Sequence, residues 1–112
     1  MHELSLAQNV VEILCEEATR HGLSQVTGYK LRVGQLRGVV PDLLRTCLDL
    51  AGRGTVAEQA EVELEVIAGH AHCGCGEEFS VSELLFLCPR CGRPGAEITS
   101  GQELRLVEIE GD

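Results

Sequence analysis

The chain has 112 residues, which is room for one ordinary domain or for a small domain with a smaller appendage. Apolar residues make up 44% of the sequence and charged residues 24%, which excludes a disordered chain. No apolar run approaches the roughly 20 residues that a membrane span requires. The N-terminal region also lacks the basic segment of a secretory signal. We therefore expect a cytoplasmic protein.

The negative charge is confined to the second half of the chain. Residues 1–56 contain six acidic and six basic residues, whereas residues 57–112 contain twelve acidic and three basic residues, which accounts for the net charge of −9. Nucleic-acid binding requires a concentration of positive charge, so we expect no nucleic-acid partner. An acidic half favours a cationic partner surface or metal ions instead.

The N-terminal region predicts an amphipathic helix over residues 5–21. Ser5 followed by Gln8 matches a capping box, and Gly22 stands where a C-terminal glycine cap belongs. Apolar residues recur at three- and four-residue steps and form a stripe that faces a core: Ala7, Val10, Val11, Leu14 and Ala18. Residues 1–4 therefore precede this helix or enter its first turn, which leaves the N-terminus accessible.

A strand, a turn and a second helix follow. Residues 26–33 alternate as a strand does, and residues 34–38 have the glycines of a turn. Pro41 suits the first position of a helix and Asp42 its positive end, so the second helix runs from Pro41 to Ala51. The side chains expected to face the core are Thr27, Tyr29, Leu31 and Val33 in the strand, and Leu43, Leu44, Cys47, Leu48 and Ala51 in the helix.

Two further strands enclose a cysteine-rich insert. Residues 61–67 and 103–110 alternate between apolar and mostly acidic side chains, with Val62, Leu64 and Val66 expected inward. We predict an α+β fold in which two helices cover one face of a three-stranded sheet that carries an inserted zinc-ribbon-like module. The predicted domains are residues 1–69 with 100–112, and residues 70–99. Candidate hinges are Gly69 and the pair Ser100–Gly101.

The insert has the cysteine spacing of a zinc module. Its pattern, Cys-x-Cys-x12-Cys-x2-Cys, is formed by Cys73, Cys75, Cys88 and Cys91. So short a segment cannot fold on its own core, so four thiolates around one Zn²⁺ would supply the folding free energy. The first pair is one residue shorter than the usual Cys-x2-Cys, and His72 with Cys75 is an alternative pair at normal spacing. We favour the four cysteines because thiolates predominate in structural sites.

A closed set of four cysteines predicts that the chain is not an enzyme. Catalytic zinc keeps an open coordination position, so Glu77 or Glu78 could act as a base only if a ligand were missing. A redox dithiol at Cys88 and Cys91 is a less economical explanation than metal binding, because a second cysteine pair lies nearby in the sequence. We expect Phe79, Leu85 and Leu87 to form a small apolar cluster beneath the zinc site.

The first residues form a potential nitrogen chelate. The Met1 α-amine, the His2 backbone nitrogen and the His2 imidazole Nδ1 make fused five- and six-membered rings with one ion. Such a planar set of nitrogens suits Ni²⁺ or Cu²⁺ rather than tetrahedral zinc. Histidine also occurs by chance at this position in many proteins, so an ordinary polar terminus is the alternative.

The sequence as a whole resembles a known family. Four segments are similar, in this order, to the hydrogenase maturation nickel metallochaperones (HypA/HybF): MHELSLAQNVVEIL, VGQLRGVVPDLL, FLCPRCG and GQELRLVEIE. The resemblance implies a transient Ni²⁺ site at the N-terminus, formed by the Met1 amine, His2, and the His2 and Glu3 backbone amides. It also implies a structural Zn²⁺ held by the four paired cysteines, although the family usually has Cys-x2-Cys where this chain has Cys73-Gly74-Cys75.

The resemblance also implies a function and partners. Proteins of this family deliver Ni²⁺ to the large subunit of [NiFe]-hydrogenase together with a nickel-binding GTPase, and some serve urease maturation with urease accessory proteins. The chain has no GxxxxGK[ST] motif, so nucleotide hydrolysis would belong to the partner. The alternative is a zinc-ribbon protein–protein adaptor without nickel delivery. A zinc hydrolase is a third class, which would need three protein ligands and a water molecule.

Overall fold

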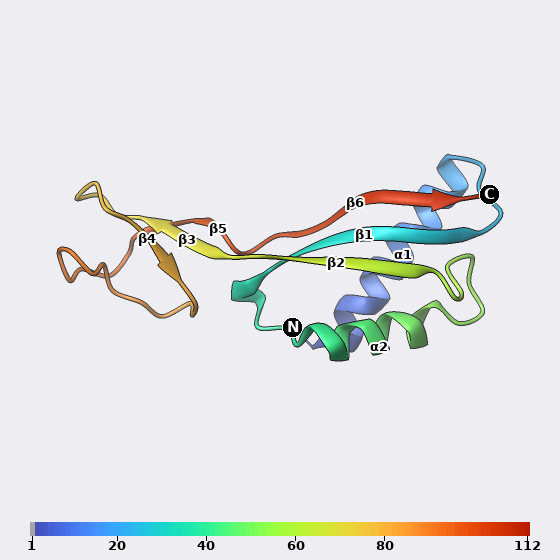
Figure 1. Cartoon of the computed structure of the whole chain (residues 1–112), viewed down its shortest axis with the longest axis horizontal. Coiled ribbons are helices and arrows are strands. Elements are labelled where there is room, and N and C mark those ends of the chain that lie inside the picture. Colours follow the sequence, from blue (N-terminus) through green and yellow to red (C-terminus); the bar gives the residue numbers. More distant parts are fainter. Residues whose placement is uncertain (1) are drawn as a thin grey trace. The chain divides into compact units, whose positions relative to one another are not determined.

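The computed structural model describes residues 2–112, which form two α-helices, one short 3-10 helix and six strands (Figure 1). In chain order they are α1 (Glu3–Arg20), β1 (Val26–Gly34), η1 (Gln35–Arg37), α2 (Pro41–Gly52), β2 (Glu61–Ile67), β3 (Gly69–His72), β4 (Glu78–Val81), β5 (Glu97–Ser100) and β6 (Leu104–Gly111). The strands form two sheets, ordered β2–β1–β6 and β4–β3–β5. The predicted α+β class is confirmed.

The chain divides into two compact units. The helical unit comprises residues 2–31, 39–65 and 105–112, and the cysteine unit comprises residues 32–38 and 66–104. The sequence predicts different bounds for two independently folding domains, which are residues 1–69 with 100–112, and residues 70–99. This division stays a prediction.

The helical unit has its core between the two helices and one face of sheet β2–β1–β6. Both helices lie on the same side of this sheet (Figure 1). The stripe predicted on α1 is buried, and the largest side chains that are almost fully buried in this unit are Leu6, Val10, Leu14, Val26, Leu31 and Leu44. An apolar stripe at helical spacing on α1 therefore meets alternating apolar residues of β1, as the two periodicities require.

Helix α1 begins two residues earlier than predicted. Its first residue is Glu3, its N-cap is His2, and no side chain caps it, so the predicted capping box of Ser5 and Gln8 is wrong. A carboxylate in the first turn is favourable at the positive end of a helix, and Glu3 provides it. The C-terminal end is as predicted, because Gly22 follows the helix and the Leu23 N–H donates to the Ala18 carbonyl at 2.8 Å.

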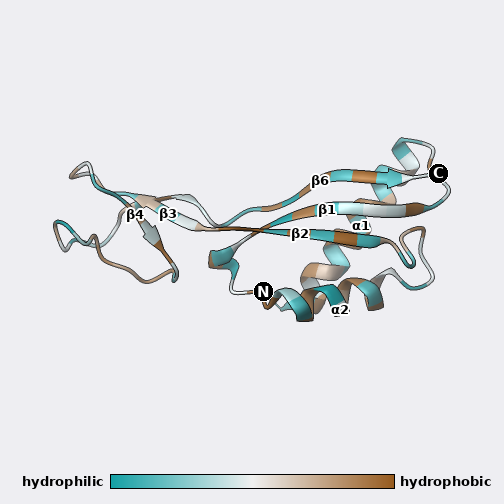
Figure 2. Cartoon of the chain, viewed as in Figure 1, coloured by the Kyte–Doolittle hydropathy of each residue, from teal (hydrophilic) through white to brown (hydrophobic). Residues whose placement is uncertain are grey.

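Three side chains that were expected to face the core are exposed. Thr27 lies near the start of β1, Leu43 is 48% exposed on α2, and Val66 is 51% exposed on β2. The buried stripe of α2 contains Leu44, Cys47 and Leu48, and Leu43 lies to one side of it. Strand β2 is at the edge of its sheet, where one long side is unpaired and side chains are less completely covered. Its alternation of hydrophilic and hydrophobic residues is visible in Figure 2.

The cysteine unit contains a small antiparallel sheet that the sequence did not predict. Strand β3 pairs with β4 and with β5, and the pairing with β5 is irregular between His70 and Ala71. The core beneath this sheet consists of few residues, which are Leu36, Ala71 and Val81 with the partly buried Phe79, Phe86, Ala96 and Ile98. Each strand has only four residues, too few for an alternating pattern to stand out in the sequence.

The segment between β4 and Cys88 corrects the predicted apolar cluster. Leu85 is 90% exposed and Leu87 is 62% exposed, so neither packs beneath the cysteines. Phe86, which lies between them, packs edge-to-face on Phe79 with ring centroids 5.7 Å apart. Successive side chains of an extended segment point to opposite sides, so burying the ring of Phe86 turns both leucines outward. Hydrophobic residues along this segment are visible in Figure 2.

Three glycines of the cysteine unit bring backbone segments into close contact. A Cβ atom on Gly34 would overlap the carbonyl oxygen of Gly101, and one on Gly101 would lie 2.6 Å from the Cα of Gly69. The Gly101 carbonyl also accepts a hydrogen bond from the Leu36 N–H at 2.8 Å. At Gly69 and Gly101, two of the predicted hinge positions, only a residue without a side chain therefore fits.

We expect Gly34→Ala to lower the free energy of unfolding by about 1–3 kcal/mol, the usual cost of overpacking. Gly28→Ala is the matched control on the same strand, because its Cβ would lie at an ordinary 3.4 Å from the Glu61 carbonyl. Denaturant unfolding of the zinc-loaded chain measures both. Equal stability of the two variants would contradict the close approach at Gly34.

Candidate metal centres

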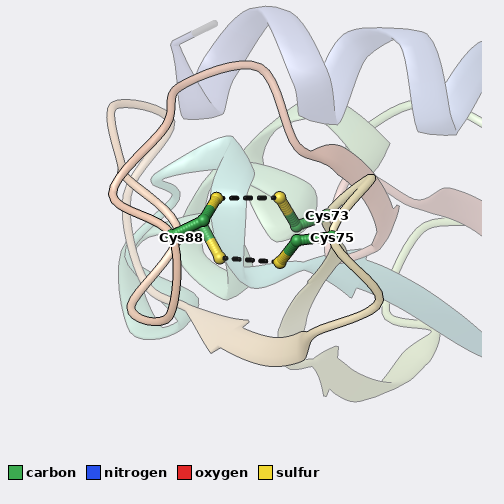
Figure 3. A group of neighbouring side chains, drawn as sticks. Cys73, Cys75 and Cys88 are labelled. Atoms are coloured by element: carbon green, nitrogen blue, oxygen red, sulfur yellow. Dashed lines mark hydrogen bonds between the residues drawn. The ribbon is translucent and has the colours of Figure 1, made fainter.

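Four cysteine side chains converge in the cysteine unit. The Sγ atoms of Cys73, Cys75, Cys88 and Cys91 all lie within 4.8 Å of one another. The shortest separations are 3.5 Å between Cys73 and Cys91 and 3.7 Å between Cys75 and Cys88. In Figure 3 the sulfur atoms of Cys73 and Cys75 face those of the second cysteine pair. The dashed lines mark the contacts of Cys73 with Cys91 and of Cys75 with Cys88.

The first cysteine pair lies on the turn of a β-hairpin. The Cys73 N–H donates to the Glu77 carbonyl at 2.8 Å, and the Gly76 N–H donates to the Cys73 carbonyl at 2.9 Å. Gly76 has a φ of +98°, a conformation that glycine adopts without the cost a side chain would add. The short Cys-x-Cys spacing is therefore accommodated by a tight turn.

The second cysteine pair lies on a separate turn. The Cys88 N–H donates to the Arg93 carbonyl at 3.0 Å, and the Gly92 N–H donates back to the Cys88 carbonyl at 2.8 Å. Gly92 has a φ of +73°, as expected from the CPRCG motif. Each pair is thus positioned by backbone hydrogen bonds of its own turn, and the fold of the cysteine unit brings the two turns together.

The cluster fits a tetrahedral metal ion with four sulfur ligands. Metal–sulfur bonds of about 2.3 Å in a tetrahedron place the sulfur atoms about 3.8 Å apart. The two shortest separations, 3.5 and 3.7 Å, are close to this value, and all four cysteines are free thiols. Zn²⁺ bound by Cys73, Cys75, Cys88 and Cys91 would close its coordination shell and act as a structural link, without a position for substrate.

The backbone around the cluster affects the ionisation of two thiols. The pKa of Cys88 is lowered to about 7, chiefly because the Cys91 N–H donates to its sulfur and also because the Arg90 N–H does, against the effect of burial. The Cys75 N–H likewise lowers the pKa of Cys73, but the neighbouring thiols and burial outweigh it and raise the value to about 11. The second turn therefore favours the thiolate form, which is the form that binds metals.

His72, the alternative zinc ligand, is not part of the cluster that the described residues form. It is the last residue of β3, where its side chain is exposed. Cys73 is buried, and its Sγ lies 3.5 Å from the Sγ of Cys91. Cys73 therefore occupies the ligand position for which His72 was the alternative. The assignment of the four cysteines as the zinc ligands stays a prediction, and the geometry supports it over the His72 alternative.

The predicted nickel ligands lie at the start of α1. Met1 lies outside the described residues, so the amine predicted as a ligand is not placed. His2 is exposed and is the N-cap of the helix, and its carbonyl accepts the Leu6 N–H at 3.0 Å. The backbone nitrogens of His2 and Glu3 precede the first hydrogen bond of the helix and so are not committed to its ladder.

Glu3 has a structural contact that the sequence could not indicate. Its Oε2 accepts a hydrogen bond from the Val40 N–H at 3.0 Å, which links the first turn of α1 to the N-cap of α2. This hydrogen bond is the main reason why the pKa of Glu3 is lowered from its ordinary value. Residues 3 and 40 are distant in sequence, so no local pattern could have predicted the contact.

Comparison with known proteins identifies the family. A family model described as "Hydrogenase/urease nickel incorporation, metallochaperone, hypA" matches residues 1–111. Hydrogenase maturation factor HypA of Rhizobium leguminosarum bv. viciae is 40% identical over 111 residues, which are 98% of each chain. HybF of Klebsiella pneumoniae is 38% identical over an alignment of 113 positions that covers 100% of each chain. The chain belongs to the HypA family.

Solved structures of HypA proteins have the same fold. The solution structure of the Ni metallochaperone HypA from Helicobacter pylori matches with a TM-score of 0.73 over 99% of this chain and 97% of that chain, at 18% identity. A second HypA solution structure matches with a TM-score of 0.67 over 99% and 96% of the chains, at 22% identity. At such low identity these matches bear on the fold alone.

Family membership confirms the coarse functional predictions. HypA proteins form a family of nickel-incorporation metallochaperones for hydrogenase and urease maturation, which is not a family of catalytic enzymes. Within the described part of the chain, neither helix is long and apolar enough to cross a membrane.

We expect Cys75→Ser to lower zinc affinity at least about tenfold. Removing a group that only supports a metal ligand already lowers affinity by this factor, and Cys75 is itself a proposed ligand. Cys15→Ser, on α1 in the helical unit, is the matched control and should bind one zinc per chain. Zinc content and the absorption of Co²⁺-substituted samples measure this. A wild-type spectrum of three thiolates and one nitrogen, lost in His72→Ala but kept in Cys73→Ser, would show that His72 is the ligand in place of Cys73.

The lowered pKa of Glu3 predicts a pH-dependent contact. Because the folded value lies below the unfolded one, the hydrogen bond to Val40 contributes stability above the unfolded pKa and is lost as pH falls through the folded pKa. We expect the amide signal of Val40 to titrate with the Glu3 carboxylate in NMR spectra. Glu3→Gln should abolish this titration, whereas Glu12→Gln on the same helix should not. A Val40 signal that titrates unchanged in Glu3→Gln would contradict the contact.

Proposed function

We propose that this protein is a nickel carrier that binds Ni²⁺ at its N-terminus and delivers it to the large subunit of [NiFe]-hydrogenase. The observation that carries the proposal is the family match over residues 1–111, together with an exposed His2 ahead of the first helical hydrogen bond. The ligands would be the Met1 amine, the His2 imidazole and the backbone nitrogens of His2 and Glu3. An all-nitrogen planar set is suited to Ni²⁺.

The surroundings of His2 support reversible binding. Its side chain is exposed, and no side-chain hydrogen bond ties it to the helix as a cap. Glu3 holds the following turn through its bond to Val40, so the helix after the site is ordered. An ion at an exposed terminus can pass to a partner by exchange of one ligand at a time, because partner ligands can approach it from solvent.

The four cysteines have a different role in this proposal. Zn²⁺ at Cys73, Cys75, Cys88 and Cys91 would be structural and would stay bound while nickel is transferred. The protein would act in the cytoplasm without catalysing a reaction, and a nickel-binding GTPase would be its partner in hydrogenase maturation. Urease accessory proteins are further partners under the same proposal, since the family description includes urease.

A second candidate function is a protein–protein adaptor without nickel delivery. The exposed leucines of the cysteine unit favour it, since Leu84, Leu85 and Leu87 are 58%, 90% and 62% exposed on one short segment. Contiguous exposed apolar side chains are typical of protein contact surfaces. An adaptor would support hydrogenase maturation with a blocked N-terminus, whereas a nickel carrier would not.

We expect His2→Ala to abolish the binding of Ni²⁺ at the N-terminal site while zinc content and fold are unchanged, because the imidazole is one of the four ligands. A short N-terminal extension should have the same effect, since it converts the Met1 amine into an amide. His21→Ala is the control, because this exposed histidine lies at the other end of α1 beside Glu17. Isothermal titration with Ni²⁺ measures all three.

Two outcomes would decide between the candidate functions. Unchanged Ni²⁺ affinity in both His2→Ala and the extended chain would refute the terminal site. Hydrogenase activity in cells that carry the extended chain, at the wild-type level, would favour the adaptor.

A further inference from the structure

The outer face of sheet β4–β3–β5 carries two histidines that the four-cysteine cluster does not include. His70 and His72 are two residues apart on β3, so their side chains project from the same face of the sheet. Both are exposed, whereas Gly69 and Ala71 are buried. The outer face is thus distinct from the inner face, on which Ala71 packs into the core of the unit.

His72 lies between two carboxylates in the register of the sheet. It is paired with Glu78 on β4 and with Glu97 on β5, and both pairings are antiparallel. Directly opposite residues of an antiparallel sheet share a face, with Cβ atoms about 5 Å apart. All three side chains are exposed, and within the described residues no hydrogen bond or ion pair engages them. Their positions are fixed by the sheet while their side chains are able to turn toward a common ion.

Two consecutive hydrogen bonds, through Ser100 to the Ala68 carbonyl, orient the His70 ring. The Ser100 Oγ donates its hydrogen to the Ala68 carbonyl at 2.9 Å, so toward the His70 Nδ1, 3.1 Å away, it acts as acceptor. Nδ1 of His70 therefore carries the hydrogen, and in the neutral ring Nε2 keeps its lone pair. A ring nitrogen that donates to a neighbouring group is the usual arrangement of a histidine that binds a metal through its other nitrogen.

We propose that this face binds a divalent first-row transition-metal ion through His70 Nε2, the His72 imidazole, and the carboxylates of Glu78 and Glu97. Two imidazoles with two carboxylates form a mixed nitrogen and oxygen set, which suits Ni²⁺, Co²⁺, Zn²⁺ or Cu²⁺. The ligands are exposed and belong to three strands, so the ion would be held less tightly than by the four cysteines and would exchange with solvent. The site is separate from the proposed nickel site at the N-terminus.

The test uses the full chain, loaded with zinc and extended at its N-terminus so that the Met1 amine is blocked. Ni²⁺ is added as the probe, with NMR spectra of the imidazole rings and isothermal titration as the readouts. We expect the ring signals of His70 and His72 to broaden together at the lowest Ni²⁺ additions, and before that of His21. His21 is the internal control, because it also lies beside a carboxylate, 3.3 Å from Glu17, but has no second histidine at the position that β3 provides.

Variants separate a built site from binding by a single histidine. His72→Ala and the double variant Glu78→Gln with Glu97→Gln should each weaken Ni²⁺ binding at least about tenfold. Ser100→Ala should weaken it without removing a ligand, because it releases the His70 ring, and His21→Ala should leave it unchanged. Zinc content is measured throughout to show that the four cysteines are intact.

The proposal is overturned if Ni²⁺ broadens His21 as early as His70 and His72, or if the variants bind as the wild type does. Because the N-terminus is blocked in every sample, neither result depends on the terminal nickel site. Failure of the proposed function would instead be seen in the unextended chain, as Ni²⁺ affinity that His2→Ala does not change.

Discussion

Four sulfur atoms brought within 4.8 Å of one another are the interaction on which the cysteine unit depends. The apolar cluster of this unit has three buried residues, Leu36, Ala71 and Val81, which is far too little apolar surface to stabilise so many residues alone. Metal–thiolate bonds can supply the missing free energy, because the ion binds the folded arrangement and has no preformed site in the unfolded chain. The hairpin turn at Cys73 and the turn at Cys88 place these four sulfur atoms around one point.

The cysteine cluster and the N-terminal site differ in solvent exposure, which decides whether an ion is kept or released. Sulfur atoms from two turns would surround an ion on all sides, and two of the four cysteines, Cys73 and Cys88, are buried. His2 is exposed at the end of a helix, where the proposed ligands are backbone and imidazole nitrogens. Under the proposed function, one chain would hold a structural ion and carry an exchangeable one, since the two ion types prefer different ligands and geometries.

Glu3 connects the N-terminal residues to the rest of the helical unit. Its carboxylate accepts the Val40 N–H, and so it stabilises the positive end of α1 and satisfies a donor at the start of α2. The residue next to the exposed His2 is thereby tied to the start of α2. Such an arrangement fits the proposed carrier, because it orders the first turn of the helix directly after His2.

Local periodicity and short motifs were enough to predict most of the secondary structure of the helical unit, the four-cysteine module and the family resemblance. They did not determine that α1 starts at Glu3, since the contact with Val40 joins distant residues. They also placed Leu85 and Leu87 inward, where the structure buries Phe86. The row of Glu78, His72 and Glu97 across three strands is found only in the folded chain, because strand register follows from the packing of Ala71 and Ile98 and not from any one segment.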